Sequence, residues 1–240
     1  MKINGWDISE ANARQWNVTF EHNEIDNDSE WVSGAASPVL LNSTLDFKEL
    51  SITLLVKGSS REEIVLNRST ILSKLLAPAV LELDGYSHFF KGVLTKASAT
   101  EQGTKKRFHT LKLTFNCYEY GAEQAIEKNK LESFTINNPG NLTTPAIIEI
   151  TPTVGLATLT ITGIVRNART GVDLPVTVKT LTTNKKVVLD GETGLITEDG
   201  VLKAGDVETY GLPSLLPGTN TIALDNGFMN VAVKFKPRYI

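Results

Sequence analysis

The chain has 240 residues, 41% of them hydrophobic, and is long enough to bury the core of one large domain or two ordinary ones. Its formal net charge of -3 offers no basic face for neutralising phosphates, which argues against a dedicated nucleic-acid-binding protein. The single cysteine, Cys117, excludes an internal disulfide, and on an apolar strand face we expect it to be buried and inert. The apolar runs are too short to cross a membrane and the N-terminal segment has no signal-peptide core, so we expect cytoplasmic synthesis without membrane insertion.

The first 31 residues carry all three tryptophans of the chain, Trp6, Trp16 and Trp31. Tryptophans fill cores and also anchor interfaces, so these side chains either clamp the domain or contact another subunit. An acidic stretch runs from Glu21 to Glu30. It lacks the glycine and the distal glutamate of a calcium loop, and we expect a solvated loop there.

A helix is predicted between Ser59 and Leu76. Ser59 or Ser60 can serve as the N-cap, with Glu62 or Glu63 completing a capping box, and Pro78 stops the helix. The pattern assigns the apolar residues to the core face and the polar ones to the outer face. The predicted core face holds Ile64, Val65, Ile71, Leu72, Leu75 and Leu76, and the outer face holds Arg61, Asn67, Arg68 and Lys74.

Strands are predicted on both sides of this helix. They cover Leu50–Val56, a hairpin with its turn at Asp84-Gly85, Val93–Ala99 and Phe108–Cys117. Strict alternation in the last strand puts four residues on a buried side, with the other side wet or paired with a partner. These four are Leu111, Leu113, Phe115 and Cys117. The basic cluster Lys105, Lys106 and Arg107 in the preceding loop is either a solvated tip or a contact with another subunit.

The composition of the chain changes after residue 120. The charged stretch 121–130 is a candidate short helix, and 137–145 has the composition of a linker. We therefore expect domains at 1–136 and 146–240. The second has almost pure period-two alternation between Gly- and Pro-containing turns, which predicts a β-sandwich.

The sequence contains no recognisable catalytic or cofactor site. The three histidines, His22, His88 and His109, lack the spacing of a metal site, and no nucleophile elbow or glycine-rich phosphate loop is present. We therefore expect no enzyme activity, metal or cofactor. A pair of carboxylates meeting from distant strands is the catalytic arrangement that the sequence leaves open.

Three blocks near the C-terminus occur in a distinctive order: VVLDGETGLITEDG, YGLPSLLPGTNTIAL and NVAVKFKPRYI. They place turns at Asp190-Gly191, Asp199-Gly200 and Pro217–Asn220, and the last strand ends near Pro237–Tyr239. In this order the blocks resemble the last domain of siphophage distal tail proteins, the Dit family. The N-terminal half is also similar to the family's ring-forming domain. That likeness rests on Asn4-Gly5, the strand at Ile52–Val56, the helix at Arg61–Leu76, the Asp84-Gly85 hairpin and the strand ending at Cys117–Tyr120.

The resemblance implies a mainly β protein. It would have an N-terminal tail-tube-like β-sandwich or barrel with one flanking α-helix, and a C-terminal galectin-like β-sandwich. It also implies a hexameric ring at the virion tail tip, assembled in the host cytoplasm, that joins the tail tube protein to the tail-associated tip protein and lets DNA pass through its lumen. The tape measure protein and receptor-binding proteins are further partners.

The resemblance and the chemistry together suggest candidate subunit contacts. These are Trp6, Trp16, Trp31, Arg61, Arg68, Lys74, Lys105, Lys106 and Arg107. We hypothesise that the acidic stretch and the basic loop pair across neighbouring subunits, because their charges are opposite. Two other functions remain open: a carbohydrate-binding baseplate or receptor-binding module that uses the C-terminal sandwich, and an enzyme that acts on cell-wall polymer.

Overall fold

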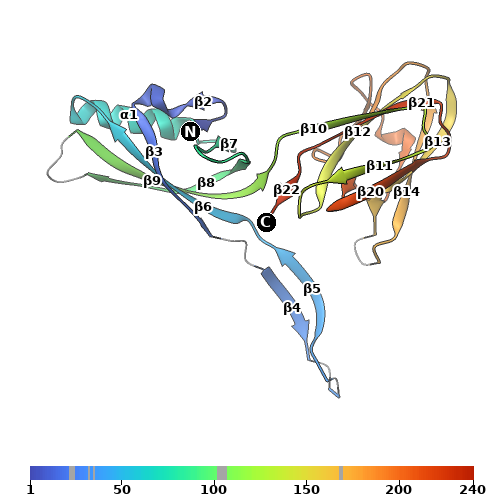
Figure 1. The fold of residues 1–240 in the computed structure, drawn as a ribbon, viewed down its shortest axis with the longest axis horizontal. Helices are drawn as coiled ribbons and strands as arrows, with labels where there is room; N and C mark the ends of the chain where they lie inside the picture. The colour runs from blue at the N-terminus through green and yellow to red at the C-terminus, as the bar shows by residue number, and fades with distance from the viewer. Residues whose placement is uncertain (22–24, 32, 35, 102–106, 168–169) are drawn as a thin grey trace. The chain divides into compact units, whose positions relative to one another are not determined.

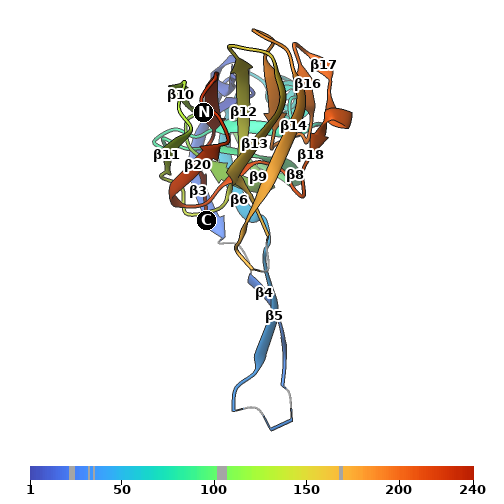
Figure 2. The ribbon, with the colours of Figure 1, turned by 90° about the vertical axis from the view of Figure 1, so that its right-hand side faces the viewer.

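The computed structural model describes residues 1–21, 25–31, 33–34, 36–101, 107–167 and 170–240. They form two compact units (Figures 1 and 2). Unit 1 is Met1–Tyr120 with Ile240, unit 2 is Gly121–Tyr239, and each has its own hydrophobic core. The prediction of a mainly β protein is confirmed, with α1 (Arg61–Ser73) as the one α-helix of the described residues.

Unit 1 is built on one antiparallel sheet with the strand order β2-β1-β7-β8-β9-β6-β3. The strands are β1 (Lys2–Ile3), β2 (Trp6–Asp7), β3 (Ala13–Glu21), β6 (Lys48–Lys57), β7 (Ala79–Glu82), β8 (Phe89–Glu101) and β9 (Phe108–Tyr120). A short 3₁₀ helix, η1 (Ile8–Ala11), precedes β3. The predicted hairpin is formed by β7 and β8, which pair from Ala79 opposite Gly92 to Glu82 opposite Phe89.

One face of this sheet is the core face, and α1 lies against it (Figure 1). Leu111, Leu113, Phe115 and Cys117 are all buried there, as their alternation predicts. Burial raises the pKa of the Cys117 thiol to about 12, which agrees with an inert thiol. On the opposite face Lys112 and Asn116 are exposed.

The helix has the predicted cap but a narrower core face. Ser60 is the N-cap and accepts a hydrogen bond from the backbone N–H of Glu63, whose carboxylate accepts one from the backbone N–H of Ser59. The helix ends at Ser73, and the prediction that Val65 and Leu76 face the core is wrong, since they are 45% and 89% exposed. Ile64, Ile71 and Leu75 are buried in the core, and Leu72 packs against it half-buried.

The acidic stretch belongs to a hairpin, so the prediction of a loop is wrong from Ile25 onward. Strands β4 (Ile25–Glu30) and β5 (Val39–Leu45) pair with each other and with no other described strand. Residues 22–24, in the first part of the stretch, lie outside the described residues.

Unit 2 is the predicted β-sandwich. One sheet has the order β10-β21-β12-β15-β16-β17 with β19 beside β12, and the other has the order β11-β20-β13-β14-β18. The strands and the 3₁₀ helix are β10 (Gln124–Asn129), β11 (Ser133–Asn138), β12 (Thr144–Pro152), β13 (Leu156–Arg166), β14 (Asp173–Leu181), β15 (Val187–Asp190), β16 (Ile196–Glu198), β17 (Val201–Leu202), η2 (Ala204–Asp206), β18 (Val207–Glu208), β19 (Ser214–Leu215), β20 (Gly218–Leu224), β21 (Met229–Phe235) and β22 (Arg238–Tyr239).

The boundary predicted at 136 is wrong, as are the short helix at 121–130 and the linker at 137–145. Strand β10 replaces the helix, and it pairs with β21 while β11 pairs with β20. The Asn- and Gly-containing stretch is a turn held by the buried Asn138 side chain. The Asn138 side chain donates to Thr144 Oγ1 at 3.2 Å and accepts from the Gly140 N–H at 3.0 Å. The chain therefore passes from unit 1 to unit 2 between Tyr120 and Gly121.

Candidate assembly interface

The outward face of the unit 1 sheet is rich in hydroxyl groups. Trp16 lies at a bulge of β3, is 63% exposed, and has the Arg14 guanidinium 5.5 Å from the centroid of its ring. An open hollow of about 670 Å³ lies over the neighbouring strands and is lined by Trp16, Asn17, Thr53, Ser98, Thr100, Thr110 and Lys112. The sheet therefore presents a solvated, polar surface on the side away from α1.

Two long edges of this sheet have no strand partner among the described residues. β3 is nine residues long and is the last strand of the sheet. β8 is thirteen residues long, and β7 pairs with only its first four, Phe89–Gly92. The edge of β8 is therefore unpaired from Val93 to Glu101. Long unpaired edges offer backbone donors and acceptors to another chain.

The free part of β8 is exposed on both faces. From Thr95 to Glu101 every residue is exposed, and the side chains that face α1 are the small ones of Ala97 and Ala99 and the carboxylate of Glu101. A buried strand would carry large apolar residues at such positions. This segment lacks the covering layer that the rest of the sheet has.

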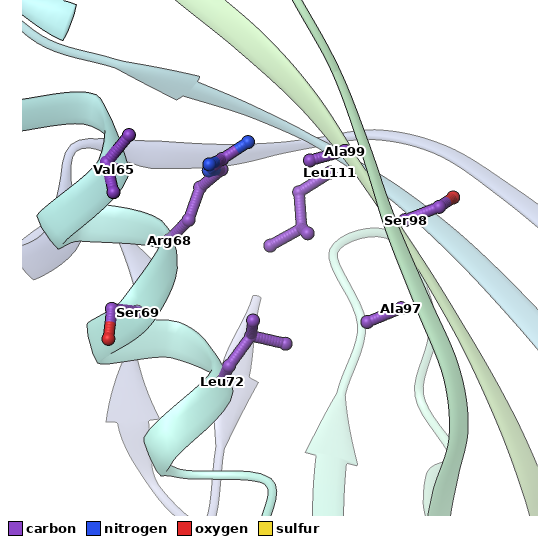
Figure 3. Close-up of a pocket in the computed structure, with 8 residues that line it drawn as sticks. All are labelled: Val65, Arg68, Ser69, Leu72, Ala97, Ser98, Ala99 and Leu111. Atoms are coloured by element: carbon purple, nitrogen blue, oxygen red, sulfur yellow. The ribbon is translucent and has the colours of Figure 1, made fainter.

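A groove runs between α1 and this part of β8 (Figure 3). Its volume is about 280 Å³, and it is lined by Val65, Arg68, Ser69, Leu72, Ala97, Ser98, Ala99 and Leu111. Most of these side chains are apolar. The polar ones are Ser69, Ser98 and Arg68, and the Arg68 Nε is buried and has no hydrogen-bond partner among the described residues. A buried donor of this kind normally has an acceptor.

The structure brings two of the predicted interface residues together in a contact within unit 1. The Lys74 ammonium lies 5.7 Å from the centroid of the Trp6 ring, and Trp6 Nε1 donates to Glu10 at 2.9 Å. Trp6 also packs against the core of unit 1. Its contacts are therefore those of the clamp that the sequence left open as an alternative.

The other predicted residues are spread over unit 1. Trp31 follows β4 and is 64% exposed, and Arg107 is exposed at the start of β9. Arg61 forms an ion pair with Glu101 at the end of β8. Lys105 and Lys106 lie outside the described residues, so the proposed pairing of the basic loop with the acidic stretch stays a prediction.

A buried ionic cluster joins three segments of unit 1. The Glu119 carboxylate forms an ion pair with Lys48 and a 2.6 Å contact with His88 Nδ1. Burial disfavours the charged carboxylate, but the hydrogen bonds from Lys48 and His88 outweigh this effect and lower the pKa of Glu119. The cluster has a structural explanation, because it ties β6 and β9 to the β7–β8 connection.

Sequence reasoning missed the free edges and the groove. The available signal was the segment 95–100, Thr-Lys-Ala-Ser-Ala-Thr, which alternates without a large apolar residue. Such a segment has no large apolar side chain with which to cover a core, which is typical of an uncovered part of a sheet. The orphaned nitrogen of Arg68 has no counterpart in the sequence, because it depends on the packing of α1 against β9.

Comparison with solved structures identifies the fold of the chain. No family model matches the chain, and no curated protein matches it. Among solved structures, the Dit protein (gp 19.1) of phage SPP1, described as a paradigm of the hub adsorption apparatus of phages that infect Gram-positive bacteria, superimposes with a TM-score of 0.78. The match covers 99% of this chain and 98% of that chain at 14% identity. The chain has the Dit fold.

Two further structures support the Dit fold. They are baseplates of phage p2 in the activated conformation, one with Sr and one with Ca, and they match with TM-scores of 0.54 and 0.52. Identities are 12% and 11%, over 96% and 97% of this chain and 92% of each matched chain. The fold expected from the C-terminal blocks and the N-terminal pattern is thereby confirmed along the full chain.

The structure contains neither a metal site nor a membrane helix within the residues that it describes. Histidine, cysteine and acidic side chains do not gather there in groups that could hold a metal ion. The helical segments in the same ranges are too short or too polar to cross a membrane.

Proposed function

We propose that this protein is a structural, non-enzymatic adaptor at the tail tip of a phage or prophage. Its unit 1 would form a ring, six copies in number by resemblance to the Dit family. The observation that carries the proposal is a Dit-fold sheet with two long unpaired edges on opposite sides and a polar outward face. Such a sheet is suited to heterologous, ring-forming contacts, in which one patch of each copy meets a different patch of the next.

The direction of the strands allows the ring to close. Neighbours in the order β8-β9-β6-β3 are antiparallel, so β3 runs opposite to β8. When a rotation places a second copy beside the first, the β3 edge of one copy meets the β8 edge of the next in antiparallel orientation. Every junction of the ring then has the same hydrogen-bonding geometry as the pairs within the sheet.

The two edges also match in length and in the position of their irregularities. Each has nine residues, and each contains one bulge residue, Trp16 in β3 and Thr95 in β8. When Ala13 lies opposite Glu101, Gln15 faces Ala99 and Val18 faces Ala97. All inward-facing residues then meet inward-facing residues, as a shared core face requires.

The polar face would line the lumen of such a ring. The hollow over it is lined by hydroxyl groups and a single basic side chain, Lys112, so DNA could pass there without being held by clustered positive charge. By the same resemblance, the ring would join the tail tube protein to the tail-associated tip protein, with the tape measure protein and receptor-binding proteins as further partners.

Solution mass and negative-stain imaging of the purified protein test this function, and a Val18→Cys/Ala97→Cys variant tests the junction. We expect rings and, under oxidation, a ladder of covalently linked copies, since directly opposed Cβ atoms lie about 4.5–5.5 Å apart. A Val18→Cys/Thr53→Cys variant is the control, because Thr53 lies on β6 and not at an edge. A protein that stays monomeric at high concentration and yields no ladder would contradict the proposal.

A further inference from the structure

The groove between α1 and β8 is an apolar site that its own chain leaves open. Val65 and the small residues Ala97 and Ala99 line it and are exposed, whereas Leu111 at its floor is buried (Figure 3). It lies directly beside the free edge of β8. A chain that pairs with this edge therefore places its own inward side chains at the mouth of the groove.

The register of the proposed ring identifies those side chains. With Ala13 opposite Glu101, the residues that face Ala97 and Ala99 are Val18 and Gln15 of the neighbouring copy. Val18 is half-buried in its own unit and packs at the margin of the core. The two alanines leave space in front of them, so an apolar Val18 side chain from the neighbour fits the apolar groove.

The neighbouring copy also brings a carboxylate to this place. The Gln15 side chain accepts a hydrogen bond from the backbone N–H of Asp84 at 3.0 Å and donates one to the backbone oxygen of Asp84 at 3.2 Å. Asp84 is therefore held against the inward side of β3. Its side chain is 65% exposed and pairs with the amino group of Met1, so a second cation can still reach it.

We propose that Arg68 of one copy binds the Asp84 carboxylate of the next copy while Val18 of that copy fills the groove. This inference rests on the ring of the proposed function and names the side chains that select its register. It gives the buried Arg68 Nε the acceptor that it lacks within its own chain. A slip by one residue would turn Val18 and Gln15 to the polar face and separate the charges, so the pair favours a single register.

A charge swap tests the pair in the full-length protein. The variants are Arg68→Glu, Asp84→Lys and the double variant, each measured for ring mass as a function of concentration. We expect each single change to raise the concentration needed for half assembly at least tenfold and the double variant to recover most of that loss. Glu82→Lys is the matched control, since Glu82 is a β7 carboxylate that pairs with Lys2 within unit 1, and it should leave assembly unchanged.

Disulfide formation in the Val18→Cys/Ala97→Cys variant shows whether a negative result concerns the Arg68–Asp84 pair or the proposed ring itself. If wild-type rings form and these cysteines link, but the double variant assembles no better than the worse single variant, the Arg68–Asp84 pair is wrong and the adaptor function stands. If no rings form and the cysteines do not link, the proposed function itself fails. Where circular dichroism shows a single charge reversal to be unfolded, the neutral changes Arg68→Gln and Asp84→Asn replace it. An unchanged assembly curve for both neutral variants overturns the pair.

Discussion

The two units of the molecule differ in the length of their free sheet edges. In unit 2 two sheets bury their inward faces against each other, and their edge strands are β17 and β18, each two residues long, and β10 and β11, each six residues long. In unit 1 a single sheet is covered on one face by α1, and its free edges on β3 and β8 are nine residues long. Proteins normally shorten or cover such edges. Under the proposed function, the longer free edges of unit 1 are the ones that neighbouring chains complete.

The two units also differ in whether the buried nitrogen atoms of their cationic side chains have hydrogen-bond acceptors. In unit 2 the Lys203 ammonium donates to the backbone oxygen of Thr180 at 2.9 Å and pairs with Glu198 at 3.2 Å and Asp206 at 3.1 Å. Burial tends to lower the pKa of Lys203, but the hydrogen bonds to Asp206 and Glu198 outweigh it and raise the pKa. Arg68 in unit 1 has no such acceptor for its Nε among the described residues. The unsatisfied buried nitrogen is thus found in the unit that we expect to assemble, whereas the unsatisfied buried atom of the Lys203 cluster is an acceptor, Glu198 Oε1.

The largest effect should come from core substitutions, and it should stay within one unit. Phe115→Ala removes a fully buried ring from the unit 1 core and should cost about 3–5 kcal/mol of the stability of that unit. Because the two cores are separate clusters, the unfolding transition of unit 2 should not move. Denaturant unfolding followed by tryptophan fluorescence reports unit 1, since all three tryptophans lie there, and circular dichroism reports both units.

Ile148→Ala is the matched change in unit 2, with an expected loss of about 2–5 kcal/mol. It should shift the transition seen by circular dichroism and leave both the tryptophan transition and ring assembly unchanged. If either variant shifted both transitions together, the units would unfold as one body and the comparison would be wrong.

The ionic cluster of unit 1 should give the next largest effect. Lys48→Met leaves the Glu119 carboxylate with His88 as its remaining partner and should destabilise unit 1 by about 3 kcal/mol near neutral pH. The pKa of Glu119 is lowered in the folded protein, so its contribution is present above the ordinary value of 4.5 and is lost as the pH falls through the lowered value. The difference between wild type and variant, measured by denaturant unfolding, should therefore shrink on acidification. A difference that is independent of pH would show that Lys48 acts by packing alone.

Local signals in the sequence predicted the parts of the fold that depend on near neighbours. The capping box at Ser60 and Glu63 and the burial of Cys117 follow from residues within a few positions of each other. The stretch 124–129 shows the limit of such signals. Its Gln, Ala, Glu and Lys residues are good helix formers, but the stretch folds as β10 because pairing with β21, about a hundred positions later, overrides local propensity.

The candidate interface was only partly predictable for the same reason. Arg68 was identified from its position on the helix, but its orphaned Nε results from packing of α1 over β9. The free edge of β8 results from the shortness of β7, which pairs with four of its thirteen residues. Which strand ends first in a sheet is decided by partners distant in sequence, and alternation within one strand does not contain that information.

The helix cap of unit 1 should give a smaller effect that tests local structure alone. Ser60→Ala removes the side chain that accepts the Glu63 N–H and should cost about 1 kcal/mol. Ser69→Ala, an exposed change within the same helix, is the control and should be neutral or slightly stabilising because alanine favours helices. Thermal unfolding of unit 1, followed by tryptophan fluorescence, measures both. An unchanged midpoint in Ser60→Ala would mean that packing alone fixes the start of α1.

The smallest expected effect is a gain in the stability of unit 1, and it concerns His109 on β9. Its side chain is buried, faces the same side of the sheet as Leu111, and neither ring nitrogen has a hydrogen-bond partner among the described residues. A buried polar group without a partner costs free energy that an apolar side chain of similar size does not. His109→Leu should therefore stabilise unit 1 by about 1 kcal/mol, measured by denaturant unfolding of the unassembled protein. If it destabilises the unassembled protein instead, the imidazole has a hydrogen-bond partner within its own chain. A loss of stability that appears only in assembled rings would instead indicate a partner from a neighbouring copy.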